Sequence, residues 1–466
     1  MIHQIGRKLR QQIHYFSGEL CNGMGCVASR FVEEAVFGIT CSGSVRLTQI
    51  GRALEETIAL HATHKRLSRN LADESLEHSI GSNVLKLGSK HINENTLLIV
   101  DPSDIQKKYA KKMQYLSQVR DGSQDTIGNG YWLCEVVGCE VGSNEITPLA
   151  QELWSQDAPD FKSDNDQILS LVKRVRQSTG GLGIIVYDRG SDRRRLLVPW
   201  TQDNTCRYLV RQRGDRHLLH KRKARSCLAL ASLCKTPYSE KIIKEKQGEE
   251  KTYFIEFGFM PVRLPECPKR ALWLVVVKGL GKKPLMLLTT EPMRRNRQVV
   301  WWAVEAYLTR WRVEDTIRFI KQSYNFEDIR VLTYNRLKNM ATLVLAASYF
   351  AAVWLGTTTK LNILAMHAMN AAKRIFGIPD FRYYALADGI SAIFKRIGKG
   401  RCTPGGTNQH HRFSYQSGEK NGGTPIKLQI DTLNSFPYDG TFIYPGPLYQ
   451  TLIFEKRKRV YTVRFK

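Results

Sequence analysis

The sequence is poor in acidic residues and lacks any paired cysteine motif. Its 43 Asp and Glu residues stand against 70 Lys and Arg, so the formal net charge is +27 and a charge-balanced surface is excluded. Ten cysteines occur at irregular intervals, without a Cys-x2-Cys pair or a Cys/His quartet. A zinc finger or a disulfide framework is therefore not expected, and we predict reduced, buried thiols.

Long hydrophobic runs are also missing. The longest uncharged run, residues 340–359, reads MATLVLAASYFAAVWLGTTT. Its strongly apolar part of about fifteen residues is shorter than the ~20 that a membrane-spanning helix needs, so we predict a buried core helix. The first thirty residues include Arg7, Lys8, Arg10 and Glu19 and build no apolar segment. No cleaved signal is expected, which predicts a cytoplasmic, nucleoid-associated protein.

The excess of positive charge is the strongest signal in the composition. Neutralising phosphates and releasing their counterions is the main source of sequence-independent affinity for nucleic acids. A basic surface kept for solubility is the alternative, but solubility rarely needs so much charge of one sign. The composition therefore predicts a nucleic-acid partner.

The first half of the chain shows two kinds of periodicity. Residues 1–90 favour helices, with apolar positions at helical intervals between Arg46 and Asn70. We interpret them as an N-terminal helical DNA-binding domain, with a solvated amphipathic face as the alternative. In residues 91–212, short apolar runs alternate with a helical stretch, which predicts the first part of an α/β core.

The second half continues this pattern with an interruption. Residues 213–295 contain several strand candidates joined by Gly and Pro turns, and we interpret them as a β-rich insertion whose entry, Arg211–Arg225, is the densest basic stretch. Residues 296–375 are strongly helical and predict the last part of the core. Residues 376–466 predict a helical region followed by a C-terminal tail.

Two aspartates follow apolar, strand-like runs. Asp101 comes after TLLIV and Asp188 after LGIIVY. Ligand sites of α/β sheets gather at the carboxyl ends of strands, so these acids are candidates for a common site. Asp104 competes with Asp101 for this role and Asp192 competes with Asp188, but placement at the strand end favours the earlier residue of each pair.

A third acid lies in the text EAYLTRWRVEDTIRFIKQS. Counted from Tyr307, the residues Arg310, Glu314 and Lys321 lie 3, 7 and 14 positions further on. At about 100° per residue they fall within roughly 60° of each other on a helix, which places a phenol, a guanidinium, a carboxylate and an ammonium on one stripe. A surface helix with ordinary ion pairs is the alternative.

Asp101, Asp188 and Glu314 together supply the hard oxygen ligands that Mg²⁺ prefers. Three carboxylates can hold two ions when phosphate oxygens complete the coordination, and Mn²⁺ can substitute. In two-metal phosphoryl transfer, cations ~3.5–4 Å apart activate the attacking oxygen and stabilise the departing 3′-oxygen. We predict these three residues as metal ligands and catalytic residues, with no small-molecule cofactor and no membrane partner.

At these residues the sequence resembles the DDE transposases of bacterial insertion sequences, in the subgroup marked by Tyr-x2-Arg-x3-Glu-x6-Lys. Tyr307, Arg310, Glu314 and Lys321 fit this pattern without a gap. The texts LLIVDPSDIQKKYA and IIVYDRG resemble the family around its two aspartates. The resemblance spans roughly residues 90–360 and implies a ribonuclease-H-like catalytic core interrupted by a β-rich insertion.

The resemblance also implies a function. Such a transposase acts as a homodimer in a synaptic complex, nicks double-stranded DNA at the inverted-repeat ends of a mobile element, and joins the 3′ ends to target DNA. In this interpretation Tyr307, Arg310 and Lys321 bind the DNA backbone near the cut. Trp311 and Arg189 are further DNA-binding candidates.

One position departs from the family. Relatives can carry a Trp in the last strand of the insertion to stack on a flipped base, but this chain has Leu285 there. Trp273, one strand earlier, is a candidate substitute, with an ordinary buried aromatic as the alternative. Chemistry through hairpin ends is therefore not implied.

The sequence leaves two other functions open. A metal-dependent nuclease would use the same acids but would not join DNA ends. A non-catalytic DNA-binding relative would occupy the ends and repress. Only a transposase would give joined products, and a pure binder would show no metal response that depends on Asp188.

Overall fold

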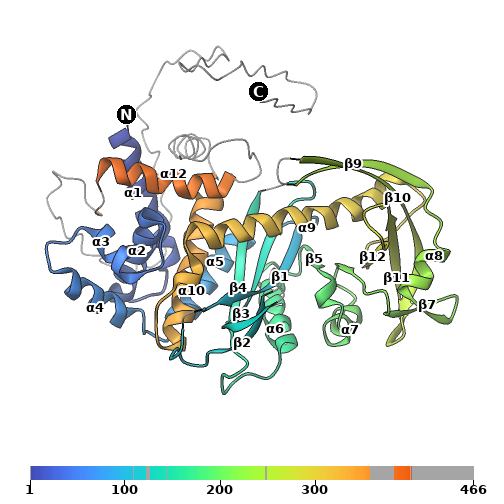
Figure 1. The fold of residues 1–466 in the computed structure, drawn as a ribbon, viewed down its shortest axis with the longest axis horizontal. Coiled ribbons are helices and arrows are strands. Elements are labelled where there is room, and N and C mark those ends of the chain that lie inside the picture. Colours follow the sequence, from blue (N-terminus) through green and yellow to red (C-terminus); the bar gives the residue numbers. More distant parts are fainter. Residues whose placement is uncertain are drawn as a thin grey trace, which may run out of the picture. The chain divides into compact units, whose positions relative to one another are not determined.

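The computed structural model (Figure 1) describes residues 2–108, 110–121, 126–143, 145–246, 249–356, 382–398 and 400. These residues form a mixed α/β fold in which helices flank one large sheet. The predicted C-terminal tail after residue 400 lies outside the described residues.

Five helices open the chain: α1 (Ile2–Leu20), α2 (Cys26–Ser42), α3 (Leu47–Leu54), α4 (Leu60–Asn70) and α5 (Leu76–Ser89). The amphipathic segment between residues 46 and 70 is two helices, because Glu55 adopts a left-handed φ of 49° and ends α3. The apolar faces of the five helices share one core with α10 (Tyr334–Ala352) and α12 (Arg382–Ile397). These helices therefore have no core of their own, and their role as a DNA-binding domain stays a prediction.

A side chain of α1 fixes the end of α12. The Arg10 guanidinium donates from Nε to the carbonyl of Gly400 and from a terminal nitrogen to the carbonyl of Gly398, both at 2.8 Å. Its Cζ also lies 5.2 Å from the centre of the Phe394 ring. Cations are favourable at helix C-termini, so this contact stabilises the junction between the first and last described helices.

The described part of the chain contains a twelve-stranded sheet with the order β2-β3-β1-β5-β6-β12-β11-β10-β7-β8, in which β4 also pairs with β3 and β9 with β10. The strands are β1 (Leu97–Gln106), β2 (Ser117–Asp121), β3 (Thr126–Cys139), β4 (Ile146–Trp154), β5 (Ile184–Tyr187), β6 (Tyr208–Arg211), β7 (His217–His220), β8 (Lys223–Ser226), β9 (Tyr238–Lys246), β10 (Glu249–Leu264), β11 (Cys267–Lys278) and β12 (Leu285–Thr289). β1 runs antiparallel to β3 but parallel to β5, and β5 runs parallel to β6.

The segment predicted as a β-rich insertion, residues 213–295, consists of β7 to β12 and the short helix α8 (Cys227–Leu233). Its strands do not form a separate sheet. β12 pairs with β6, and β11 and β10 extend the same sheet outward. The insertion is therefore continuous with the core through backbone hydrogen bonds.

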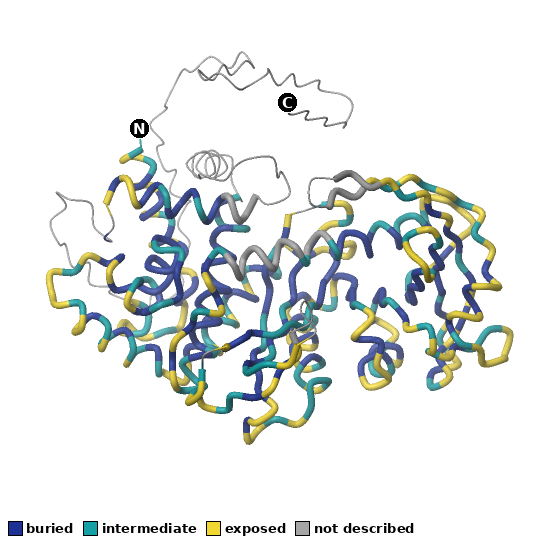
Figure 2. The backbone as a smooth tube through the Cα atoms, in the orientation of Figure 1, coloured by how far each residue is buried: buried dark blue, intermediate teal, exposed yellow. Residues whose placement is uncertain are grey.

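Alternating side chains of the strands build two layers. Leu97 and Ile99 of β1 face the layer that contains α9 (Arg297–Ser323). Leu98 and Val100 face the opposite layer, with α6 (Asp164–Ser178) and α7 (Arg194–Gln202). The central strands are buried on both faces, and exposed segments gather at the rim (Figure 2).

The predicted core helix is confirmed. The segment Tyr334–Gly356 is long and apolar enough to cross a membrane by length and composition, but 83% of its most apolar window is buried in the protein. The nine described cysteines form no disulfide, and all of them except Cys26 are buried. Cys402 lies outside the described residues.

Candidate active site

The two predicted aspartates lie at the same level on neighbouring parallel strands. β1 and β5 pair from Leu97 with Ile184 up to Val100 with Tyr187, and each aspartate is the next residue. The expectation that the first strand ends at Asp101 is wrong, because β1 continues to Gln106 through its pairing with β3. The parallel pairing of β1 with β5 ends just before Asp101. Because adjacent strands lie about 4.8 Å apart, the backbones of Asp101 and Asp188 are close together.

Strand alternation sends both carboxylates toward α9. Side chains two residues apart share a face of a strand, and Ile99 and Val186 belong to the core layer beneath α9. Asp101 and Asp188 follow them by two positions and therefore point the same way. Helix α9 runs over this face from the insertion strands toward α10 (Figure 1).

Helix α9 is held against the sheet by apolar packing and by polar contacts, one of which lies beside the site. Val300, Val304 and Tyr307 are fully buried in the layer between helix and sheet. The amide of Gly142, in the turn between β3 and β4, donates to the hydroxyl of Thr309 at 2.9 Å. These contacts fix the turn of α9 that carries the next residue, Arg310.

Arg310 lies among the predicted acids. Its side chain is only 4% exposed, it forms an ion pair with Glu314 one turn further along α9, and one guanidinium nitrogen lies 4.0 Å from Oδ1 of Asp101. Burial by itself would lower the pKa of the guanidinium, yet its pKa is raised because the surrounding acidic groups favour the charged form. These groups are Tyr307, Glu314, Asp188 and Asp101.

The three acids from distant parts of the chain are thus brought to one cation. Asp101 is 19% exposed and Glu314 is 33% exposed, so both are open to solvent or a ligand. Among the described residues, however, no group of three or more Asp, Glu, His or Cys side chains is close enough to hold a metal ion. The Arg310 guanidinium is the cation that the three carboxylates have in common.

The other residues of the predicted helical stripe differ in exposure. Tyr307 is fully buried, with the Arg310 Cζ 5.1 Å from the centre of its ring and the Trp311 ring centre at 5.4 Å. A direct contact of Tyr307 or Arg310 with DNA therefore requires these side chains to be uncovered. Their DNA-binding role stays a prediction, as does that of the partly buried Trp311.

Two further DNA-binding candidates lie near the acids in sequence. Lys321 belongs to α9, but its side chain is outside the described residues. Arg189 directly follows Asp188 and is exposed. Both assignments stay predictions.

The structure separates Asp188 from its competitor Asp192. Oδ1 of Asp188 accepts hydrogen bonds from the amide of Ser191 at 3.0 Å and from its hydroxyl at 3.1 Å, which caps a short 3₁₀ helix and leaves the carboxylate half-buried. Asp192 is fully buried in an ion pair with Arg216 and also accepts from the amide of Arg213. Asp192 is therefore committed to the fold, whereas Asp188 faces the site.

Asp104 lies three positions after Asp101 on β1, so strand alternation turns its side chain to the opposite face of the sheet. Its carboxylate accepts a hydrogen bond at 2.9 Å from the side-chain Nε2 of Gln106 on the same strand. The nearby Lys107 is buried and donates to the carbonyls of Glu327 and Ile329, at 2.6 and 3.2 Å. Lys107 is thus a structural link to the segment after α9 in this conformation.

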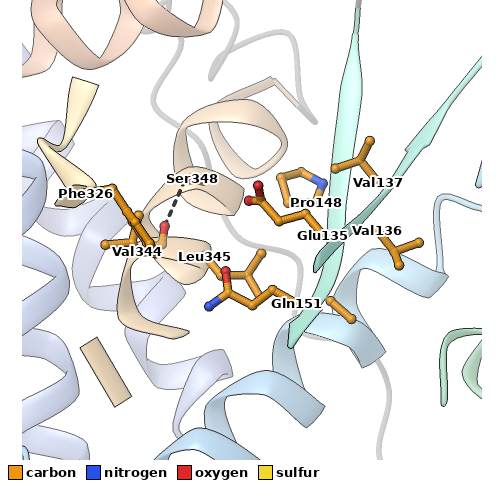
Figure 3. Close-up of a pocket in the computed structure, with 10 residues that line it drawn as sticks. Glu135, Val136, Val137, Pro148, Gln151, Phe326, Val344, Leu345 and Ser348 are labelled. Carbon is orange, nitrogen blue, oxygen red and sulfur yellow. Dashed lines mark hydrogen bonds between the residues drawn. The ribbon is translucent and has the colours of Figure 1, made fainter. Parts of the chain in front are cut away.

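Sequence reasoning missed one acid beside the site. Glu135 of β3 pairs directly with Asp101 across the antiparallel ladder, and directly opposed side chains share a face with Cβ atoms about 5 Å apart. Glu135 also lines a small cavity between β3, β4 and α10, where Ser348 donates to the carbonyl of Val344 at 2.8 Å (Figure 3). The available signal was the single charge inside the apolar run YWLCEVV.

The position where relatives can carry a stacking Trp is buried. Leu285 is 4% exposed and packs beneath α9. Trp273 lies on the neighbouring strand β11, packs against the same layer and is only partly buried. Its role as a substitute stays a prediction.

The donor chemistry of the site fits a divalent cation. Asp101, Glu135, Asp188 and Glu314 offer carboxylate oxygens on one side of the sheet, and Arg310 is the cation among them. Mg²⁺ and Mn²⁺ prefer such oxygen ligands. A divalent ion would have to share these carboxylates with the guanidinium or displace it.

Comparison with known proteins identifies the family. Residues 96–350, more than half of the chain, match the family described as Transposase DDE domain, and the chain belongs to this family. Members of this family generally use divalent metal ions. A search of curated proteins gives no match.

A search of solved structures finds a similar chain in a transposase complex. A chain of a piggyBac transposase synaptic complex with hairpin DNA, determined by cryo-EM, is 10% identical in sequence with a TM-score of 0.39. The similarity covers 84% of this chain and 79% of that one.

Proposed function

We propose that the chain is a transposase of the insertion-sequence type, which cleaves the ends of a mobile element and joins the 3′ ends to target DNA. The observation that carries this proposal is that Asp101 and Asp188 each directly follow the parallel pairing of β1 with β5 and face Glu314 and Arg310 on α9. The strand order β4-β3-β1-β5-β6, with three antiparallel strands followed by two parallel ones, supports a ribonuclease-H-like core.

The proposal gives each residue of the site a role. Asp101, Asp188 and Glu314 would hold two divalent ions, with Glu135 as a further acid beside Asp101. When bound, such ions activate an attacking oxygen and stabilise the departing 3′-oxygen. The hydrogen bonds from Ser191 orient the Asp188 carboxylate.

The proposed partners follow from charge and family. The net charge of +27 supports binding of double-stranded DNA at the element ends and at the target. Membership in the Tyr-x2-Arg-x3-Glu-x6-Lys subgroup rests on Tyr307, Arg310, Glu314 and Lys321, and a homodimer in a synaptic complex belongs to the same proposal. We place its action in the cytoplasm, at the nucleoid.

A matched pair of variants on α9 tests the proposal. Glu314→Gln removes one negative charge without changing the shape of the side chain, so we expect it to abolish cleavage of end DNA while duplex binding stays nearly unchanged. Glu305→Gln is the control, because nine residues at about 100° each place it on the opposite side of the same helix. Cleavage by Glu314→Gln at the wild-type rate would overturn the assignment of the third acid.

A second measurement distinguishes a transposase from a nuclease. The cut ends are incubated with a supercoiled plasmid and Mg²⁺, and joined products are resolved on a gel. We expect covalent joining that depends on Asp188. Efficient cleavage without joined products would favour the nuclease alternative.

A further inference from the structure

A short β-hairpin in the insertion has an unusual turn. β7 and β8 pair from His217 with Ser226 to His220 with Lys223, which leaves Lys221 and Arg222 as a two-residue loop. Both loop residues have positive φ, 49° and 64°. Two successive positive φ angles are typical of a type I′ turn, which favours Asn-Gly, Asp-Gly or Gly-Gly.

The residues that occupy this turn are poorly suited to it. Side chains with a Cβ disfavour the left-handed region, and only Gly, Asn and Asp adopt it readily. Lys221 and Arg222 are the only two consecutive non-glycine residues with positive φ in the part of the chain that the structure describes. Strained backbone of this kind is concentrated at functional sites, where another requirement outweighs the local cost.

These loop residues do supply positive charge at an exposed tip. Lys221, Arg222, Lys223 and Arg225 are all exposed, and within the described residues none of them forms a salt bridge. Exposed segments lie at this outer edge of the insertion (Figure 2). An exposed tip with four cations and no acidic partner is complementary to a polyanion.

The base of the hairpin is fixed, so the tip is presented by a rigid support. Leu218 is fully buried in the core on the α6 side, and Leu219 pairs with Arg263 of β10. A ring nitrogen of His220 lies 2.8 Å from the carbonyl oxygen of Pro261. A two-stranded β-ribbon of this kind fits the major groove of duplex DNA.

We propose that the hairpin His217–Ser226 is a DNA-binding element that contacts the phosphates of the element end inside the cleavage site. This inference rests on the proposed function. Five strand intervals separate β5, which ends beside Asp188, from β7. At about 4.8 Å per interval this is roughly 24 Å, or about seven base pairs of duplex that runs along the sheet.

Substitutions in the turn can test the role of its charge in DNA binding separately from its effect on protein stability. Lys221→Asn with Arg222→Gly places the preferred I′ residues in the loop and removes two cations, so we expect the thermal unfolding midpoint to rise while DNA binding weakens. Lys223→Gln with Arg225→Gln removes two cations from β8 and leaves the turn unchanged. Lys162→Gln with Lys173→Gln is the charge-matched control near α6.

Binding is measured by fluorescence anisotropy at several salt concentrations, on end duplexes that extend about 5 or about 20 base pairs inside the cut. On the longer duplex, both hairpin variants are expected to make the negative slope of log affinity against log salt shallower by about two, since each lost phosphate contact removes about 0.9 from its magnitude. On the shorter duplex, and for the α6 control on either duplex, the slope is expected to stay at the wild-type value.

The possible results distinguish a failure of the hairpin inference from a failure of the proposed function. Hairpin variants that bind the longer duplex with the wild-type slope overturn the inference, and so does an equal loss on both duplexes. Failure of the wild-type protein to bind or cut either duplex counts against the proposed function, not against the hairpin alone. A stabilised Lys221→Asn, Arg222→Gly variant with weakened binding supports the inference, because a purely structural turn would not lose affinity as it gains stability.

Discussion

Arg310 is expected to behave as the internal counter-ion of the acidic site. Its side chain is almost completely buried and faces Glu314, Asp101 and Asp188, so Arg310→Gln would leave these acids without their shared cation. Removing one partner of a buried ion pair costs about 3–5 kcal/mol. Because Glu314 is 33% exposed and Asp101 19% exposed, solvent screens part of this loss, and we expect about 3 kcal/mol in metal-free protein.

Divalent ions are expected to reverse much of this loss. A ligand that binds only the folded state at 100 times its Kd stabilises that state by about 2.7 kcal/mol. If the guanidinium and the ion share the same carboxylates, ion binding raises the unfolding free energy of the variant more than that of the wild type. The difference in unfolding free energy between them should therefore fall by at least half in saturating Mn²⁺.

The assay is urea unfolding followed by circular dichroism, with chelator or with Mn²⁺, and calorimetry gives the Mn²⁺ affinity of each folded protein. Arg176→Gln is the control, because Arg176 is 12% exposed and pairs with Asp203 on the opposite side of the sheet. The loss of unfolding free energy in Arg176→Gln should be the same with and without Mn²⁺. If the loss in Arg310→Gln is also independent of Mn²⁺, the guanidinium does not occupy a place where a cation is needed, and the reasoning fails.

Three further variants test other charged groups of the fold and of the site. Asp192→Asn should destabilise the protein by roughly 3–5 kcal/mol in urea unfolding because it breaks the ion pair between the buried Asp192 carboxylate and Arg216, whose side chain is 17% exposed, whereas Asp188→Asn should lose cleavage but unfold close to the wild-type midpoint. Burial lowers the pKa of Lys107 from 10.5 to about 8, so between these pH values the unfolded chain binds more protons than the folded one. The stability of wild type relative to Lys107→Met should therefore rise with pH across this window, by up to about 3 kcal/mol, and a flat difference between pH 7.5 and 10.5 would contradict this assignment.

Local patterns in the sequence predicted several elements of the fold and the residues of the candidate site. The apolar runs before Asp101 and Asp188 indicated buried strands, and the spacing from Tyr307 to Lys321 indicated one helical stripe. These predictions work because hydrophobic periodicity and helix geometry depend on residues close together in the chain. The core helix α10 was predictable for the same reason.

Only the tertiary structure decided how these pieces meet. The extension of β1 beyond Asp101, the position of Glu135 opposite it and the continuity of the insertion with the core sheet all depend on pairing between distant strands. The choice between Asp188 and Asp192 depends on Arg216, which lies 24 residues further along the chain. The burial of Arg310 among acids from three segments is likewise a long-range result, because charge spacing along one helix does not determine which opposing groups the folded sheet brings to it.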